Sequence, residues 1–326
     1  MDLLLTLWLG TPAWLWLAFF TIVIGLLALD LGVLHRGNRE IGVRESLGLS
    51  AFYITMGVGF GLWVWWQLGS ETGLAYLTGF VIEKSLAMDN IFVIAMIFAA
   101  FAIPRHLQHR VLFWGVLGVI VLRALMIGAG VALVENFGWV LYVFAAFLIW
   151  TGIGMWRTAG QDYDVQGSGF YRLLTARLRI TEGLRGEHFL VREKTVDGVG
   201  RLFATPLLLA LLMIEFVDII FAVDSIPAIF AITTDPFVVY TSNIFAILGL
   251  RALYFALAAM VHRFAYLKHA LAVLLVFIGS KIFLADMLGL AKLPPALSLG
   301  VTFAILAGGI GWSMWRTREG AQEVPA

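Results

Sequence analysis

Acidic side chains lie inside two of the most apolar stretches of the sequence. Residues 213–236, MIEFVDIIFAVDSIPAIFAITTDP, carry Glu215, Asp218 and Asp224, and residues 83–90, EKSLAMDN, carry Glu83 and Asp89. A single charged side chain at the centre of a bilayer costs at least about 2.5–3.5 kcal/mol. Acids kept in such segments indicate polar surroundings and a functional role, such as an ion or proton pathway.

The two acidic stretches align with each other as copies of one unit. The matched positions are Glu83 with Asp218, Asp89 with Asp224, and Asn90 with Ser225. Further along, LRAL at 122–125 recurs at 250–253, which matches Arg123 with Arg251. Each unit would hold three spans, and an odd number inverts the second copy across the membrane. Inverted repeats with an ion site near the midplane are a common transporter plan. A chance match between short motifs is the alternative.

Helix geometry separates the two acids of each stretch. Seven residues nearly close two turns, so Glu83 and Asn90 share a helix face, as do Asp218 and Ser225. A spacing of six does not, so either the helices are interrupted or each carboxylate faces a different neighbour. Pro227 favours an interruption of the 213–236 span. Carbonyls freed beside carboxylates would suit a hard cation.

The balance of interior charges predicts the sign of the ligand. The interior acids are Asp30, Glu83, Asp89, Glu215, Asp218 and Asp224, and the interior bases are Lys84, Arg123, Arg251 and Lys281. The excess of two negative charges suits a divalent cation. Oxygen donors without thiolate favour Mn, Mg or Ca, and Asn90, Ser225 and Asn243 could add neutral oxygen ligands.

We therefore predict a metal site built from both stretches. Asp89 and Asp224 are the expected core ligands, while Glu83 and Asp218 are second ligands or proton carriers. The full expected set is Asp89, Asp224, Glu83, Asp218, Glu215, Asn90 and Ser225.

Structural roles remain open for several of these charges. The acids could instead pair with Arg123, Arg251 or Lys281 to hold helices together, and Asp30 suits a ligand or a structural role equally. Lys84 and Lys281 could neutralise neighbours or extend toward an interface. Asp235, in TTDP, suits a turn better than chemistry.

Composition sets the fold class of the whole chain. Of 326 residues, 61% are hydrophobic and only 13% are charged, against about 25% charged in soluble domains. The class is an all-α polytopic membrane protein. Nine apolar runs lie near residues 14–35, 46–67, 74–101, 111–134, 138–156, 204–232, 237–260, 265–288 and 296–315.

The basic residues predict the orientation of these runs. With the N-terminus outside and the C-terminus in the cytoplasm, nearly all loop Lys and Arg residues fall inside, and only Lys292 falls outside. The first run has no basic leader, so it is expected to be a retained span. The chain then divides into two N-terminal spans (1–73), a first repeat (74–156), a cytoplasmic linker (157–203), a second repeat (204–290), and a last span with a cytoplasmic tail (291–326).

The linker offers one amphipathic feature. YRLLTARLRI, within 157–203, suits a short helix on the inner membrane surface, and a plain solvated connector is the alternative.

Several function classes find no support in the sequence. The chain has no cysteine, which excludes disulfides, thiolate metal sites and thiol redox chemistry. No nucleotide-binding P-loop, HExxH or suitably placed GxSxG is present, so we expect no enzyme and no resident cofactor. A net charge of +1 gives no reason to expect nucleic acid. Intramembrane aspartyl proteolysis would need two aspartates in one cleft without the surrounding Lys and Arg.

The charged motifs also resemble those of a known family. GFVIEKSLAMDNIFV (79–93), VLGVIVLRALMI (116–127), EFVDIIFAVDSIPAIFAITTDPF (215–237) and TSNIFAILGLRALYF (241–255) resemble the TerC family of bacterial membrane proteins, in particular its Alx-like members. The resemblance covers roughly residues 75–290. It implies a relative of the LysE-type exporters, with members linked to manganese efflux, alkaline pH and tellurite resistance.

Residue chemistry and resemblance together predict a transporter of the bacterial inner membrane. It would export a divalent cation, with Mn(II) the first candidate, in exchange for protons. Export of Ca(II), or a membrane-embedded scaffold or stress-response partner that docks through 157–203, are the alternatives.

Overall fold

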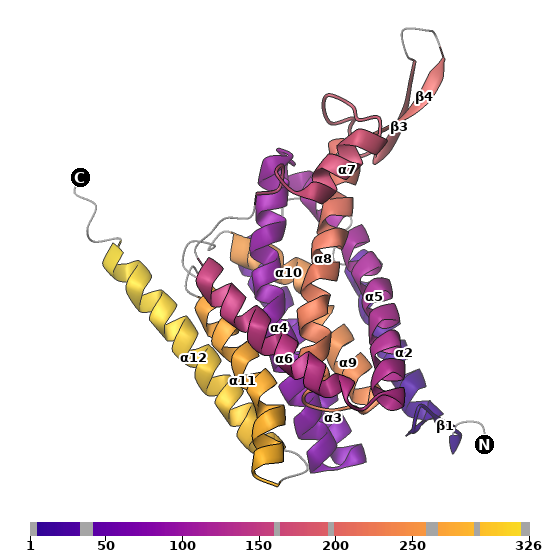
Figure 1. Cartoon of the computed structure of the whole chain (residues 1–326). Helices are drawn as coiled ribbons and strands as arrows, with labels where there is room; N and C mark the ends of the chain where they lie inside the picture. The colour runs from indigo at the N-terminus through magenta and orange to yellow at the C-terminus, as the bar shows by residue number, and fades with distance from the viewer. Residues whose placement is uncertain are drawn as a thin grey trace.

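The computed structural model is a bundle of long helices from which one small extramembrane segment projects (Figure 1). The structure describes residues 5–32, 42–159, 164–194, 199–258, 267–289 and 294–320. Lys292, the basic residue expected on the outer side, lies outside the described residues. The elements in chain order are β1 (Leu7–Trp8), β2 (Thr11–Pro12), α2 (Ala13–Gly32), α3 (Val43–Leu68), α4 (Ser70–Ala100), α5 (Arg105–Asn136), α6 (Val140–Thr158), α7 (Gly169–Arg177), β3 (Leu190–Lys194), β4 (Gly200–Ala204), α8 (Pro206–Phe230), α9 (Pro236–Ile247), α10 (Leu250–Ala258), α11 (Leu267–Met287) and α12 (Pro295–Gly320).

The helices make this an all-α polytopic membrane protein. Within the described residues, seven helices are long and apolar enough to cross a bilayer: α2, α3, α5, α6, α8, α11 and α12. The pair α9 and α10 together makes an eighth candidate. The remaining long helix, α4, has 31 residues but concentrates Glu83, Lys84 and Asp89 in its middle.

The interruption predicted for the 213–236 span is wrong. α8 runs unbroken through Pro227 to Phe230. Pro227 cannot donate to the Val223 carbonyl, but the helix continues past it and Ala231 donates to the Pro227 carbonyl. The break falls instead in the 237–260 run, where α9 and α10 meet at 41°. Gly249 lies there with a φ of +79°, a conformation that favours glycine.

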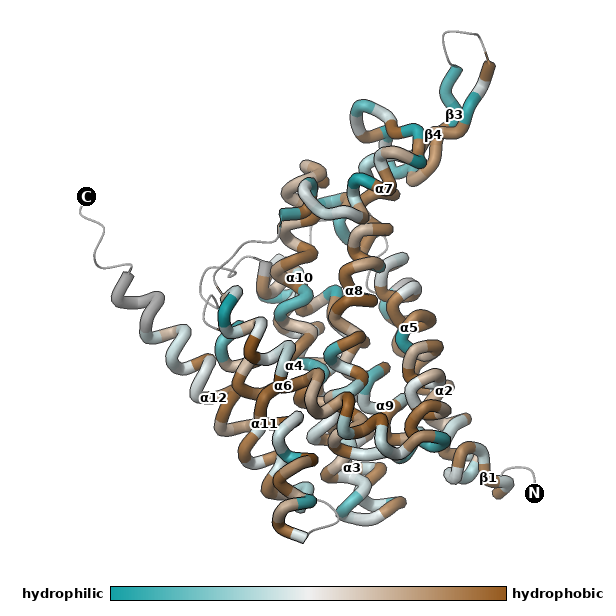
Figure 2. Tube along the Cα trace, viewed as in Figure 1, coloured by the Kyte–Doolittle hydropathy of each residue, from teal (hydrophilic) through white to brown (hydrophobic). Residues whose placement is uncertain are grey.

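Hydrophobic side chains cover the outside of the bundle. Figure 2 shows hydrophobic residues along most of the bundle helices and many hydrophilic ones on α7 and the β3–β4 hairpin. Trp66 and Trp150 expose 78% and 71% of their surface. Such an apolar exterior suits contact with lipid, because a soluble protein rarely exposes so large an apolar surface.

The interior is built around α4 and α8. α4 packs against α3, α8 and α9, α5 packs against α8, and α6 packs along α11. Aromatic contacts join the N-terminal helix to the core, since Trp16 and Phe19 of α2 lie 5.1 and 6.0 Å from the rings of Phe237 and Phe245 in α9. Asp235, expected in a turn, is the N-cap of α9 and accepts hydrogen bonds from two backbone amides.

The segment expected as a linker is partly folded. The short helix expected near residues 171–180 is α7, which Ser168 caps at its N-terminus. Its Phe170 ring stacks on Phe216 of α8 at 4.0 Å, so α7 is docked on the bundle. β3 and β4 form an antiparallel hairpin that the sequence analysis did not predict.

Candidate functional site

Arg123 lies at the centre of a buried group of polar side chains. Arg123 of α5 donates from Nε and Nη2 to the two carboxylate oxygens of Asp218, over 3.2 and 3.1 Å. Its Nη1 donates to Glu83 of α4 and to the hydroxyl of Ser225, at 2.9 Å from the latter. A longer contact of 3.3 Å reaches Asn243 of α9. One guanidinium therefore joins both acidic stretches across four helices.

These groups are almost fully removed from the surface. Arg123 is 2% exposed, Glu83 3% and Asp218 7%. Asn90 donates to Asp218 over 3.4 Å at the edge of the same network. We call Glu83, Asn90, Arg123, Asp218, Ser225 and Asn243 the arginine network. Two carboxylates facing one guanidinium with neutral hydrogen-bond partners form a buried ion-pair cluster of the kind that fixes helix positions.

Asp89 and Asp224 lie in a different place. Both line one pocket of about 520 Å³ between α4, α6, α8 and α11, which we call the wide pocket. Lys268 at the start of α11 lines the same pocket, as does Thr151 of α6, whose hydroxyl interacts with the Asp224 carboxylate. Asp89 is 6% exposed, and its buried Oδ1 has no hydrogen-bond partner among the described residues. The wide pocket thus presents two carboxylates from the two aligned positions.

The structure therefore separates residues that the sequence grouped in one site. Asp89 and Asp224 share the wide pocket, whereas Glu83, Asn90, Asp218 and Ser225 belong to the arginine network. The helices are straight here, so the six-residue spacing turns the two acids of each stretch to different neighbours. Of the two geometries that the spacing allowed, the structure adopts this second one.

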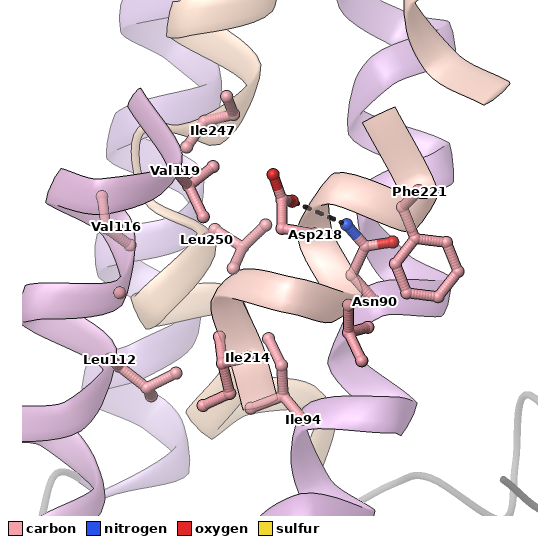
Figure 3. A pocket seen from close by; sticks show the side chains of 12 residues that line it. Asn90, Ile94, Leu112, Val116, Val119, Ile214, Asp218, Phe221, Ile247 and Leu250 are labelled. Atoms are coloured by element: carbon pink, nitrogen blue, oxygen red, sulfur yellow. Dashed lines mark hydrogen bonds between the residues drawn. The ribbon is translucent and has the colours of Figure 1, made fainter. Parts of the chain in front are cut away.

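A much smaller cavity lies beside the arginine network. Asn90 and Asp218 face it from α4 and α8 among apolar side chains such as Ile94 and Leu112 (Figure 3). Its volume is about 20 Å³, which is room for about one water molecule. We call it the narrow pocket. The Asn90 Oδ1 is buried, and no hydrogen-bond partner for it lies in the part of the chain that the structure describes.

Glu215 belongs neither to the arginine network nor to the lining of the wide pocket. It lies against Gly118 of α5, so close that a Cβ added to that glycine would overlap its carboxylate. Its Oε2 is buried without a hydrogen-bond partner. A side chain at position 118 would therefore displace the flexible end of Glu215.

The other interior charges have structural partners. Lys84 donates to the carbonyls of Ala246 and Leu248, over 2.9 and 3.2 Å, where α9 ends at the helix break. Arg251 pairs with Asp30 of α2 at 2.6 Å, and Lys281 donates to Ser298 of α12 over 3.2 Å. For Asp30 the structure thus shows a pairing role.

No ready-made cage for a metal is present in the described part of the chain, since no three His, Cys, Asp or Glu side chains come together there. A cation in the wide pocket would have two carboxylates, and water or hydroxyl oxygen would complete its shell. Sequence reasoning missed Lys268, Thr151 and Phe221, which line this pocket. They carry no local signal, because an isolated Lys at a loop end or a Phe in a span is common.

Comparisons with known proteins place the chain in one family. The sequence model described as "Integral membrane protein TerC family" matches residues 68–321. An "Uncharacterized membrane protein STKORF319" of Myxococcus xanthus is 47% identical over 310 residues, covering 95% of this chain and 94% of that protein. The "Putative membrane-bound redox modulator Alx" is 48% identical over 306 residues in Salmonella typhi and 47% identical over 306 residues in Escherichia coli, covering 91% of this chain and 92% of each relative. No solved structure matches. The chain belongs to the TerC family of integral membrane proteins.

Proposed function

We propose that this chain is a secondary transporter that exports a divalent metal cation, with Mn(II) as the first candidate, in exchange for protons. One observation carries the proposal: Asp89 and Asp224, from two separate helices, line the same wide pocket. Paired carboxylates in a membrane interior rarely serve packing alone. Oxygen ligands suit Mn(II), Mg(II) and Ca(II) better than softer metals.

The proposed architecture has nine spans and two inverted repeats, residues 74–156 and 204–290. α4 would count as the ninth span despite its charges. The packing supports this plan, because α4 meets α9 as α8 meets α5, while α6 meets α11 and α4 meets α8. A pseudo-twofold axis relating the repeats would produce these pairings. We place the chain in the bacterial inner membrane, with the N-terminus outside and the C-terminus in the cytoplasm.

The name of the Alx relatives refers to redox modulation. This chain has no cysteine, so it has no thiol with which to carry electrons. Control of a redox-active metal ion would affect redox state indirectly, and that role is compatible with the proposed export.

Reconstituted full-length protein tests the proposal directly. Mn(II) entry into liposomes is measured with an enclosed metal-quenched dye, and an enclosed pH dye records proton exchange. Asp89→Asn and Asp224→Asn should each lower the Mn(II) rate at least about tenfold, which corresponds to roughly 1.4 kcal/mol. Glu71→Gln is the control, because this exposed acid lies on α4 away from the pocket. Wild-type rates in both aspartate variants would refute the proposal, and Ca(II) in place of Mn(II) tests the closest competing ion.

A further inference from the structure

The wide and narrow pockets lie on adjacent faces of the same two helices. On α4, Asp89 and Val93 line the wide pocket, whereas their sequence neighbours Asn90 and Ile94 line the narrow one. Asp89 and Val93 are four positions apart, as are Asn90 and Ile94, so the members of each pair lie on one helix face. The two pockets are thus distinct compartments on either side of one α4 ridge.

Phe221 is the residue of α8 that touches both compartments. Asp224 lines only the wide pocket, and Asp218 lines only the narrow one. Phe221 lies three residues from each and lines both pockets. Figure 3 shows its ring beside Asn90 at the edge of the narrow pocket. An aromatic ring therefore lies between the two aspartates along α8.

The compartments differ in the ligands they can hold. The wide pocket, about 520 Å³, has room for an ion with its water, whereas the narrow pocket, about 20 Å³, has room for about one water molecule. Unpartnered buried oxygens lie on both sides, the Asp89 Oδ1 in a residue that lines the wide pocket and the Asn90 Oδ1 in one that lines the narrow pocket. Phe221 lines both pockets and so borders any direct path between them, and the narrow pocket has room only for a species that has lost most of its hydration.

We propose that the Phe221 ring is the barrier between these compartments and that it determines which cations pass, by admitting only those that shed their water. Phe221 is a positioning residue in this role, because it offers a cation no ligand atom. The barrier follows from the two pockets alone, while its effect on ion choice rests on the proposed transport function.

The lack of cysteine gives a direct test that needs no transported ion. Single Val93→Cys and Ile94→Cys variants of the full chain are compared, because these neighbours are equally buried, at 5% and 4%, but line different pockets. A charged methanethiosulfonate reagent should label the Val93→Cys thiol readily and the Ile94→Cys thiol slowly. Adding Phe221→Ala should raise the rate at Ile94→Cys at least about tenfold, by the removal of a ring-sized obstacle.

The matched control is Phe216→Ala, which removes a partly buried ring of α8 that stacks on α7 away from both pockets. It should leave both labelling rates unchanged, and a monodisperse size-exclusion profile shows that the Phe221→Ala protein is folded. The barrier is overturned if Ile94→Cys is labelled as fast as Val93→Cys while Phe221 is present. An unchanged Ile94→Cys rate in Phe221→Ala, or no labelling at Val93→Cys, would also overturn it.

Ion flux tests the second half of the proposal separately. Mg(II) gives up its water reluctantly, so liposomes with wild-type protein should admit less Mg(II) than Mn(II). Phe221→Ala should raise the Mg(II)-to-Mn(II) ratio several-fold. An unchanged ratio together with faster thiol labelling would overturn the role in ion choice. Failure of the wild-type protein to move Mn(II) would refute the transport function, and the labelling result would still decide whether the barrier exists.

Discussion

Arg123→Met is the substitution expected to damage the fold most. It removes the guanidinium that pairs with both Glu83 and Asp218 and that donates to Ser225. Methionine has a similar length and fills much of the same space, so the change tests charge and hydrogen bonding more than volume. The two carboxylates would be left beside each other with no positive partner in the network.

The cost follows from how deeply the network is buried. Arg123 and Glu83 expose only 2% and 3% of their side chains, so solvent cannot stabilise the charged Glu83 carboxylate once the guanidinium is removed. Removing one partner of a buried ion pair typically costs about 3–5 kcal/mol. The variant that also carries Glu83→Gln and Asp218→Asn should regain most of that loss, since no uncompensated charge then remains.

Thermal unfolding of the purified full chain in detergent measures both effects, with monodispersity on size-exclusion chromatography as a second readout. Arg251→Met is the matched control, because its partner Asp30 is 19% exposed and can be hydrated. The midpoint should therefore fall further for Arg123→Met than for Arg251→Met.

Two results would contradict this account of the arginine network. One is an Arg123→Met protein as stable as the Arg251→Met control. The other is a triple variant no more stable than Arg123→Met alone, because that would show that shape or hydrogen-bond geometry, and not the buried charge, sets the cost.

Two smaller predictions test neighbouring contacts. Gly73→Ala should destabilise the protein by about 1–3 kcal/mol, because its methyl would lie 2.6 Å from the Trp65 backbone, whereas Gly118→Ala meets only the flexible end of Glu215, which can turn aside, and should be nearly neutral; equal unfolding midpoints would contradict this. Lys84→Met should leave two carbonyls at the α9–α10 break without their donor and cost about 1–3 kcal/mol, and a wild-type midpoint would show that water replaces the ammonium there.

The sequence predicted the helices well because each lies in a long apolar run. Runs such as 111–134 and 138–156 correspond to α5 and α6. The predicted position of the helix break was wrong because Pro227 is a strong local signal, yet α8 continues past the one hydrogen bond that this proline cannot donate. Gly249 causes the break through a backbone conformation that depends on the fold around it.

The partners of the charges could not be predicted from spacing alone. Periodicity assigned Glu83 and Asn90 to one helix face, but it could not indicate that the face meets Arg123. Lys84 reaches carbonyls 162 and 164 residues away. Such contacts depend on how helices distant in the chain pack together, and a list of charged residues carries no information on that packing.

The ion pairs in the structure change the count of interior charges that favoured a divalent ion. Counted over all spans, the acids exceeded the bases by two, but Glu83 and Asp218 share Arg123, and Asp30 has Arg251. In the wide pocket, Asp89 and Asp224 alone would balance a divalent ion, yet Arg157 of α6 and Lys268 line the same pocket. With all four charges present, a bound dication would leave two positive charges in excess. A dication would therefore compete with Arg157 and Lys268 for the two carboxylates, and that competition would weaken binding and favour release of the ion.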